Sequence, residues 1–317
     1  MLIEPTPYLI LLPAIALCAV LGANNLSACV GSSLGARALK YHQALILASI
    51  GLFGGILLEG SKLSGSINGG IIASIDTRLT LSVELSSLAL MAFLTYRRLP
   101  ISLSQVAVGA AIGSAVAEGI GVNWSFTMLV AASWLLTPLS GLMLAFLLSL
   151  ATKRRGKHVG GVLSRNLSFA YMTVISGIYA AYTLGANTVG LIVGMSESPG
   201  LSPLLISIVL GLATILGMLL LSHGTIRSVA ENLVGLNPST SFAAQMGGAL
   251  TVHGFTEFGI PVSVSQAVVG GVFGATIPRM IVLRNDRLTR EIMIGWTVAP
   301  LLGAILGLVT SILLSTV

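Results

Sequence analysis

Ten apolar segments cover most of this 317-residue chain and fix the class of fold that it can adopt. A helix of about 20 residues crosses the roughly 30 Å hydrocarbon core of a bilayer. Only 8% of the residues are charged and 55% are hydrophobic, so water cannot solvate such a surface. The chain is therefore predicted to be an all-α, multi-pass membrane protein with about ten transmembrane helices. The segments lie near residues 8–34, 42–60, 79–96, 101–117, 123–150, 167–195, 201–222, 239–256, 261–281 and 290–315.

The basic residues are distributed unevenly between the loops that join these segments. If all ten segments cross, 14 of the 16 Lys and Arg residues fall on one side, and only Lys62 and Arg78 fall on the other. Positively charged loops face the cytoplasm, which predicts that both termini are extracytoplasmic. A re-entrant fourth segment would move the basic loop at 151–166 to the opposite side, so ten crossings are favoured. The sequence alone leaves open whether segments 100–118 and 261–281 span fully or re-enter.

An internal repeat divides the chain into two halves. Three motifs recur at nearly constant offsets of 163, 161 and 162 residues: Gly22-Ala-Asn24 as Gly185-Ala-Asn187, Pro100-x-Ser-x-Ser-Gln105 as Pro261-x-Ser-x-Ser-Gln266, and Trp134-x-x-x-Pro138 as Trp296-x-x-x-Pro300. Five crossings per half make the two halves enter the membrane from opposite faces, which is the inverted repeat of many secondary transporters. The predicted domains are a first repeat at 1–150, a basic cytoplasmic linker at 151–166 and a second repeat at 167–317.

The Gly-Ala-Asn motifs place polar side chains in the middle of long apolar segments. Asn24 and Asn25 lie in the first copy, and Asn187 and Thr188 lie in the second. Buried amides need hydrogen-bond partners, and glycine allows the backbone to leave the helix, so we expect broken helices that line a cavity. The alternative is a helix-packing notch closed by asparagine hydrogen bonds. Two symmetric copies favour the ligand site.

The Pro-x-Ser-x-Ser-Gln motifs are typical of helix starts, with proline in the first turn and serine as the cap. A helix N-terminus carries partial positive charge and free N–H donors, so it favours bound anions. Capping alone would explain one serine per motif but not the second serine and the glutamine. The apolar segments contain no Lys or Arg, so a small tetrahedral oxyanion held by neutral donors is predicted. The additional donors are Ser102, Ser104, Gln105, Ser263, Ser265 and Gln266.

These motifs resemble those of the inorganic phosphate transporter (PiT) family. The matching stretches are GANNLSACVGSSLGA at 22–36, GANTVGLIVG at 185–194 and the two Pro-x-Ser-x-Ser-Gln motifs, and the resemblance covers essentially the whole chain. It implies ion-coupled import of phosphate, or of sulfate in some members. It also implies that the Gly-Ala-Asn and Ser/Gln positions line the anion and cation sites. The family's aspartate after Gly-Ala-Asn is Asn25 in one copy and Thr188 in the other.

The loss of these two carboxylates bears on the coupling ion. It weakens the case for sodium coupling, leaves at most a residual sodium site near Asn24 and Asn187, and favours proton coupling or sulfate as the substrate. Glu84 in the third segment and His253 in the eighth are the candidates for carrying a proton. For Glu84, a surface ion pair with Arg78 is an alternative role. The choice between sodium and proton is left open.

The predicted function is that of a secondary active transporter that imports inorganic phosphate by alternating access. The alternatives are a proton-coupled permease for sulfate or another tetrahedral oxyanion, and an anion channel. An enzyme is not expected because no nucleophile–base pair or metal-binding motif is present, and no cofactor is predicted. The expected partners are the anion and the lipid bilayer of the plasma membrane, without nucleic acid. A homodimer is left open.

Overall fold

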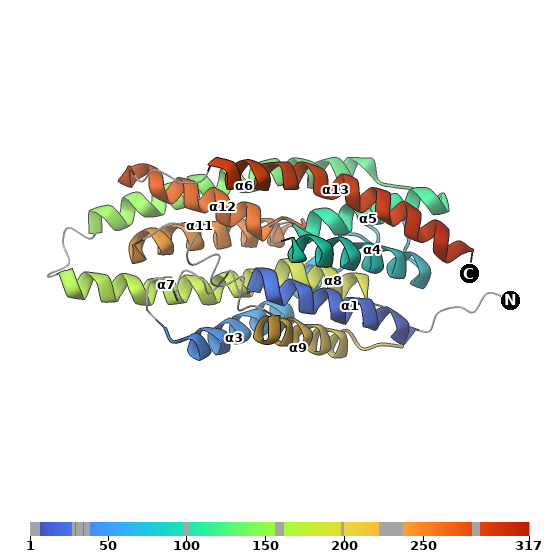
Figure 1. Cartoon of the computed structure of the whole chain (residues 1–317), viewed down its shortest axis with the longest axis horizontal. Coiled ribbons are helices and arrows are strands. Elements are labelled where there is room, and N and C mark those ends of the chain that lie inside the picture. The colour runs from blue at the N-terminus through green and yellow to red at the C-terminus, as the bar shows by residue number, and fades with distance from the viewer. Residues whose placement is uncertain are drawn as a thin grey trace.

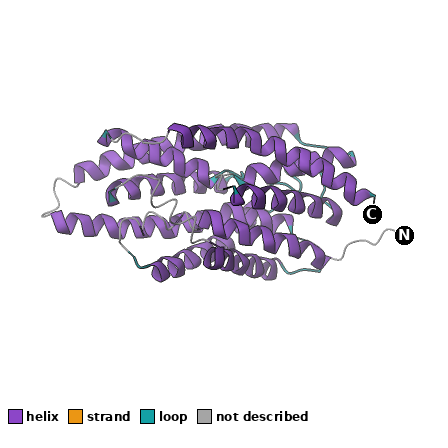
Figure 2. Cartoon of the chain, viewed as in Figure 1, coloured by secondary structure: helices purple, strands orange, loops and turns teal. Residues whose placement is uncertain are grey.

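The structure, a computed structural model, describes residues 7–26, 29, 34, 39–97, 102–155, 162–197, 200–221, 237–280 and 286–316. It is built from helices that run mostly along one long axis, with both termini at the same end (Figure 1). No strand occurs among the described residues (Figure 2).

Helices form in all ten of the predicted segments. Those of the first half of the sequence are α1 (Pro7–Leu21), η1 (Gly22–Leu26), α3 (Tyr41–Glu59), η2 (Gly60–Leu63), α4 (Thr77–Tyr96), α5 (Leu103–Glu118) and α6 (Trp124–Arg155). Those of the second half are α7 (Val162–Leu184), η3 (Gly185–Val189), α8 (Gly190–Met195), α9 (Pro203–Leu221), α11 (Pro238–Glu257), α12 (Val264–Thr276), η4 (Ile277–Arg279) and α13 (Asp286–Ser315). The symbol η denotes short 3₁₀ or π helices.

Among the described residues, seven helical stretches are long and apolar enough to cross a membrane. The helices α5 and α12 have 16 and 13 residues, fewer than the roughly 20 that a crossing requires. The helix α11 has 20 residues but is rich in Ser, Thr and other polar residues. The all-α, multi-pass architecture is therefore confirmed, whereas the count of ten full crossings is not.

The short helices belong to two hairpins, α4–α5 and α11–α12, whose tips meet inside the molecule. The hydroxyl of Ser104, in the first turn of α5, donates to the carbonyl oxygen of Val262, just ahead of α12, over 2.9 Å. Figure 1 shows the two hairpins approaching each other from opposite ends of the long axis. Each hairpin thus extends only part of the way along the molecule.

Glycines hold each hairpin against a long helix from the other half of the sequence. Gly109 of α5 lies on the backbone of Pro300 in α13, and Gly270 of α12 lies on the backbone of Pro138 in α6. In both contacts, a glycine of a hairpin helix packs on the proline of the Trp-x-x-x-Pro motif in the other half of the sequence. Backbones can approach this closely only where a side chain is missing.

The remaining helices also pair across the two halves. The helix α1 packs on α9, with Gly22 against the backbone of Thr214, and α3 packs on α7, with Gly55 against the backbone of Tyr182. The two halves of the sequence are thus intertwined. Any rigid-body movement would therefore involve groups of helices drawn from both halves.

Candidate functional site

Both Gly-Ala-Asn motifs form π-helical turns in otherwise α-helical segments. These turns are η1 after α1, and η3 between α7 and α8. The predicted interruption of the helix is present, but it takes the form of a wide turn that directly follows α1 in the first copy and joins α7 to α8 in the second. Such turns are rare and are frequently found at functional sites.

Asn187 uses its side chain to hold the tip of the α11–α12 hairpin. Its amide nitrogen donates to the hydroxyl of Thr256 over 2.9 Å and to the carbonyl oxygen of Ile260 over 3.1 Å. Its amide oxygen accepts from the backbone N–H of Val262 at 3.2 Å. The side chain is fully buried. Asn187 therefore fits the alternative considered above, a helix-packing notch closed by asparagine hydrogen bonds.

We expect Asn187→Leu to lower the free energy of unfolding by about 2–4 kcal/mol, because three hydrogen bonds are lost and buried backbone groups remain unpaired. Thermal unfolding of the purified protein in detergent measures the change. Asn68→Leu, at an exposed asparagine, is the control and should change stability little. Equal stability of the two variants would contradict this structural role.

The two Pro-x-Ser-x-Ser-Gln motifs begin helices α5 and α12, as predicted. Ser102 accepts from the backbone N–H of Gln105 at 3.4 Å, and Ser263 accepts from that of Gln266 at 3.2 Å. Ser263 also shares a hydrogen bond of 2.9 Å with Ser265. The position of the proline differs from the prediction: Pro261 precedes the N-cap by two residues instead of occupying the first turn, and Pro100 lies outside the described residues.

Trp134 fixes the second of these motifs from the side. Its indole nitrogen donates to the carbonyl oxygen of Pro261 over 3.2 Å. Trp134 and Pro138 belong to one copy of the repeated Trp-x-x-x-Pro motif, and Pro138 is the residue on which Gly270 packs. The long helix α6 therefore positions both the tip and the body of the second hairpin.

The two motif glutamines are buried with an unused polar atom. Gln105 and Gln266 are each only 2% exposed. Within the described part of the chain, the Oε1 atom of neither residue has a hydrogen-bond partner. Rotating the terminal amide by 180° places the NH₂ group at the same point, so each side chain can present a donor there. Each half therefore contains a buried polar atom that is available for one more hydrogen bond.

The other predicted site residues belong to the two π-helical turns. Thr188 is buried in η3, next to Asn187. Asn24 and Asn25 lie in η1 and are partly buried, and the carbonyl oxygen of Asn25 accepts from the thiol of Cys29 at 3.4 Å. The turn η1 packs against α9, whereas η3 packs against α3 and α11.

Glu84, a candidate for proton coupling, is fully buried in α4. Its Oε1 accepts from the hydroxyl of Ser196 at 2.8 Å, and its Oε2 has no partner among the described residues. The alternative in which it reaches the surface and pairs with Arg78 is wrong, because the side chain has no exposed surface. A carboxyl held in this way retains its candidacy as a proton carrier.

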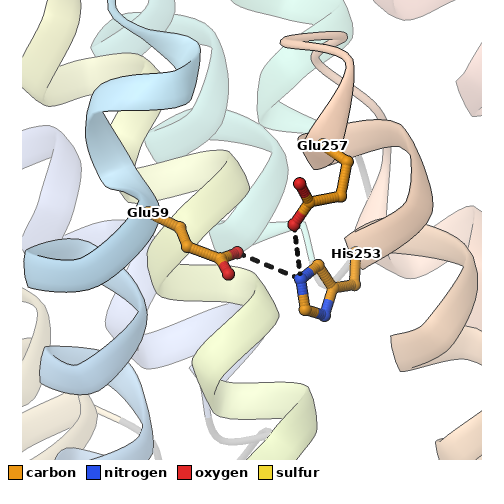
Figure 3. A group of neighbouring side chains, drawn as sticks. All are labelled: Glu59, His253 and Glu257. Atoms are coloured by element: carbon orange, nitrogen blue, oxygen red, sulfur yellow. Dashed lines mark hydrogen bonds and ion pairs between the residues drawn. The ribbon is translucent and has the colours of Figure 1, made fainter.

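His253, the second candidate, belongs to a charged cluster that joins α3, α7 and α11. Its Nε2 lies 3.0 Å from Glu257 Oε1 and 3.2 Å from Glu59 Oε2, while its Nδ1 is hydrogen-bonded to the hydroxyl of Tyr179. Figure 3 shows both carboxylates pointing toward the imidazole. Lys62 donates to Glu257 over 2.7 Å. Glu257 is thus in contact with both Lys62 and His253.

Sequence reasoning missed Glu59, Lys62 and Tyr179 as members of this cluster. Lys62 and Glu257 are 195 residues apart in the chain, so no local pattern links them. The spacing of four residues between His253 and Glu257 on one helix face was the only available signal.

Comparison with known proteins identifies the family. The model of the phosphate transporter family matches residues 21–307. The chain belongs to the phosphate transporter family. The match includes both Gly-Ala-Asn motifs and both hairpin motifs.

Several relatives and one solved structure match along nearly their whole length. A protein named "Putative phosphate permease" from Methanocaldococcus jannaschii is 28% identical, covering 92% of each chain. The sulfate permease CysP of Bacillus subtilis is 25% identical, covering 89% of this chain and 80% of its own length. A structure titled "The sodium-dependent phosphate transporter" matches with a TM-score of 0.87 at 21% identity, covering 99% of this chain and 100% of that one. This last match supports the fold.

Proposed function

We propose that this chain is a secondary active transporter that imports inorganic phosphate by alternating access. The observation that carries the proposal is the pair of hairpin tips that meet at the starts of α5 and α12. Each tip combines a helix N-terminus with a buried glutamine that has an unsatisfied polar atom. Two such tips form a donor-rich site, which suits a tetrahedral oxyanion. Membership of the phosphate transporter family supports phosphate as the anion.

The proposed binding residues are those of the two hairpin tips and the two π turns. The serines at the helix starts and the two glutamines would contact the anion, and the Gly-Ala-Asn residues would hold the tips and line the site. Asn187 acts mainly by positioning, because its amide is already fully engaged. The remaining proposed residues are Asn24, Asn25, Ser102, Ser104, Thr188, Ser263 and Ser265.

The proposed organisation of the chain is an inverted repeat, with halves at 1–150 and 167–317 and a cytoplasmic linker at 151–166. Both termini would lie outside the cell, in the plasma membrane. Helices of the two halves pack on each other, so the units that move during transport would be mixed layers of helices. The protein would have no enzymatic activity and no cofactor.

Sulfate is the second candidate substrate. The match to a sulfate permease supports it, as does the absence of the two family aspartates at Asn25 and Thr188. Phosphate and sulfate have the same shape and differ in charge and protonation, so neutral donors alone discriminate weakly between them. Uptake of radiolabelled phosphate and sulfate into proteoliposomes decides between the two anions.

We expect sodium to have little effect on uptake, because Asn25 and Thr188 supply no negative charge to hold it. Replacing external sodium by choline should change the initial rate of phosphate uptake less than about twofold. A change of this size is comparable to the small free energy of an exposed ion pair. An inward proton gradient at constant choline should accelerate uptake, with Glu84 and His253 as the proposed proton carriers. A steep sodium requirement would refute this view of the coupling ion, while leaving the anion site intact.

A further inference from the structure

We propose that Glu59, His253 and Glu257 form a binding site for one divalent transition-metal ion of the Zn²⁺ class. This site is separate from the anion site and does not rest on the proposed function. It lies where α3 from the first half of the sequence meets α11 from the second half, beside the tip of the α11–α12 hairpin.

The donor atoms already have the spacing of metal ligands. The Nε2 atom of His253 lies 3.0 Å from Glu257 Oε1 and 3.2 Å from Glu59 Oε2. All three donors lie within 4.8 Å of one another. Ligands at 2.0–2.1 Å from a tetrahedral ion are roughly 3.3 Å apart. An ion can thus be accommodated by small side-chain rotations, and Glu257, with 47% of its side chain exposed, is accessible to water.

The imidazole is oriented in the way that metal-binding histidines usually are. Its Nδ1 is hydrogen-bonded to the hydroxyl of Tyr179, which leaves Nε2 facing the two carboxylates. Tyr179 and Tyr182 also flank the ring, with centroids 5.6 and 5.9 Å away. The tyrosine hydroxyl can accept from an Nδ1–H, and in that tautomer the Nε2 lone pair is free for a metal ion.

One carboxylate oxygen in the cluster lacks a hydrogen bond. Glu59 Oε2 is buried and has no hydrogen-bond partner among the described residues, although it lies 3.2 Å from His253 Nε2. In the tautomer of His253 that carries its proton on Nε2, this single proton cannot point at both carboxylates at once. A metal ion satisfies the imidazole and both carboxylates together, which hydrogen bonding alone does not.

The charge of the cluster also favours an additional cation. Two carboxylates face one lysine, Lys62, whose Nζ lies 2.7 Å from Glu257 Oε1 and 3.5 Å from Glu59 Oε1. Lys62 is one-third exposed at 34%, so it can move into solvent when an ion binds. The nitrogen ligand disfavours Mg²⁺ and Ca²⁺, which prefer oxygen ligands, and favours Zn²⁺ or Co²⁺.

The test is metal binding by the purified full chain after treatment with a chelator. Titration with Zn²⁺ by calorimetry should give one saturable site, and Co²⁺ should give a visible absorption band from its bound nitrogen and oxygen ligands. His253→Gln and Glu257→Gln should each weaken Zn²⁺ binding by about tenfold or more. Lys62→Met should strengthen it by about tenfold, because it removes a competing positive charge.

Matched controls separate this site from adventitious binding. His42→Gln removes an exposed histidine elsewhere on α3, and Lys153→Met removes a lysine that bonds only to the carbonyl oxygen of Pro278 among the described contacts. Both should leave Zn²⁺ affinity unchanged. The proposal is overturned if wild type and Lys62→Met bind neither ion saturably at millimolar concentration, or if His253→Gln binds as wild type does. Because metal binding is the readout, failure of this site leaves the anion site at the hairpin tips untouched. A bound ion would leave Glu84 as the proposed proton carrier, since a metal-bound Nε2 cannot take up a proton.

Discussion

Gln105→Ala and Gln266→Ala should each reduce phosphate uptake by about tenfold or more, and the double variant should have no measurable uptake. Each glutamine is 2% exposed and has a polar atom without a partner among the described residues. A hydrogen bond to a charged group contributes about 1.5–3 kcal/mol, which corresponds to a change in affinity of roughly 10- to 150-fold. Initial rates in proteoliposomes, measured over a range of phosphate concentrations, separate weaker binding from slower turnover.

The matched control for these variants is Gln43→Ala. Gln43 is exposed in the first turn of α3 and bonds only to the nearby backbone N–H of Lys40 among the described contacts. It should transport as the wild type does. Normal uptake by both single variants, at equal amounts of protein in the vesicles, would refute the assignment of the anion site to the hairpin tips.

Gly109→Ala and Gly270→Ala should each prevent normal assembly of a hairpin, with a loss of about 3 kcal/mol or more of stability. A methyl group at either position would lie 2.1 Å from a carbonyl oxygen, that of Pro300 for Gly109 and that of Pro138 for Gly270. Backbone atoms of a neighbouring helix cannot rotate away as a side chain can. The yield of monodisperse protein after detergent extraction, together with its thermal unfolding, measures the effect.

Gly254→Ala is the control for the glycine variants. It also lies within a helix, but a methyl group there meets no atom within 4 Å. Alanine stabilises helix interiors over glycine by roughly 0.5–1 kcal/mol, so this variant should unfold at the same temperature as wild type or slightly higher. If Gly109→Ala behaved in the same way, the close contact between α5 and α13 would not exist.

Local patterns in the sequence predicted the helices and the helix starts well. The serine caps at Ser102 and Ser263 follow from side-chain chemistry within three residues, and both are present. The interruptions at Gly-Ala-Asn were also predicted, although not their π-helical form. These features depend on neighbours in the chain, which is why they can be predicted without tertiary structure.

Counting charges cannot distinguish a hairpin from two crossings. Replacing two successive crossings, such as α4 and α5, by one hairpin leaves every later loop on its original side. The basic linker at 151–166 therefore keeps its position in both topologies. Only the residues at the hairpin tip change their place, and that tip contains too few charges to affect the count.

The cluster at His253 was beyond sequence reasoning for a different reason. Its members come from α3, η2, α7 and α11, which are brought together only by the packing of one half on the other. Glu59 and Lys62 lie at the end of an apolar helix, where charged residues ordinarily face water. Nothing local distinguishes such residues from solvated ones.

The meeting of the two hairpin tips also bears on the direction of transport. The tips contribute the same kinds of groups, a capped helix start and a buried glutamine, from opposite ends of the molecule. An anion bound between them would meet equivalent donors whether it arrived from outside or from the cytoplasm. The affinity of the site for the anion would then be similar on the two faces, so the site itself would impose no direction on transport. Net movement would follow the gradients of the anion and its coupling ion, and reversing those gradients would run the same protein backwards.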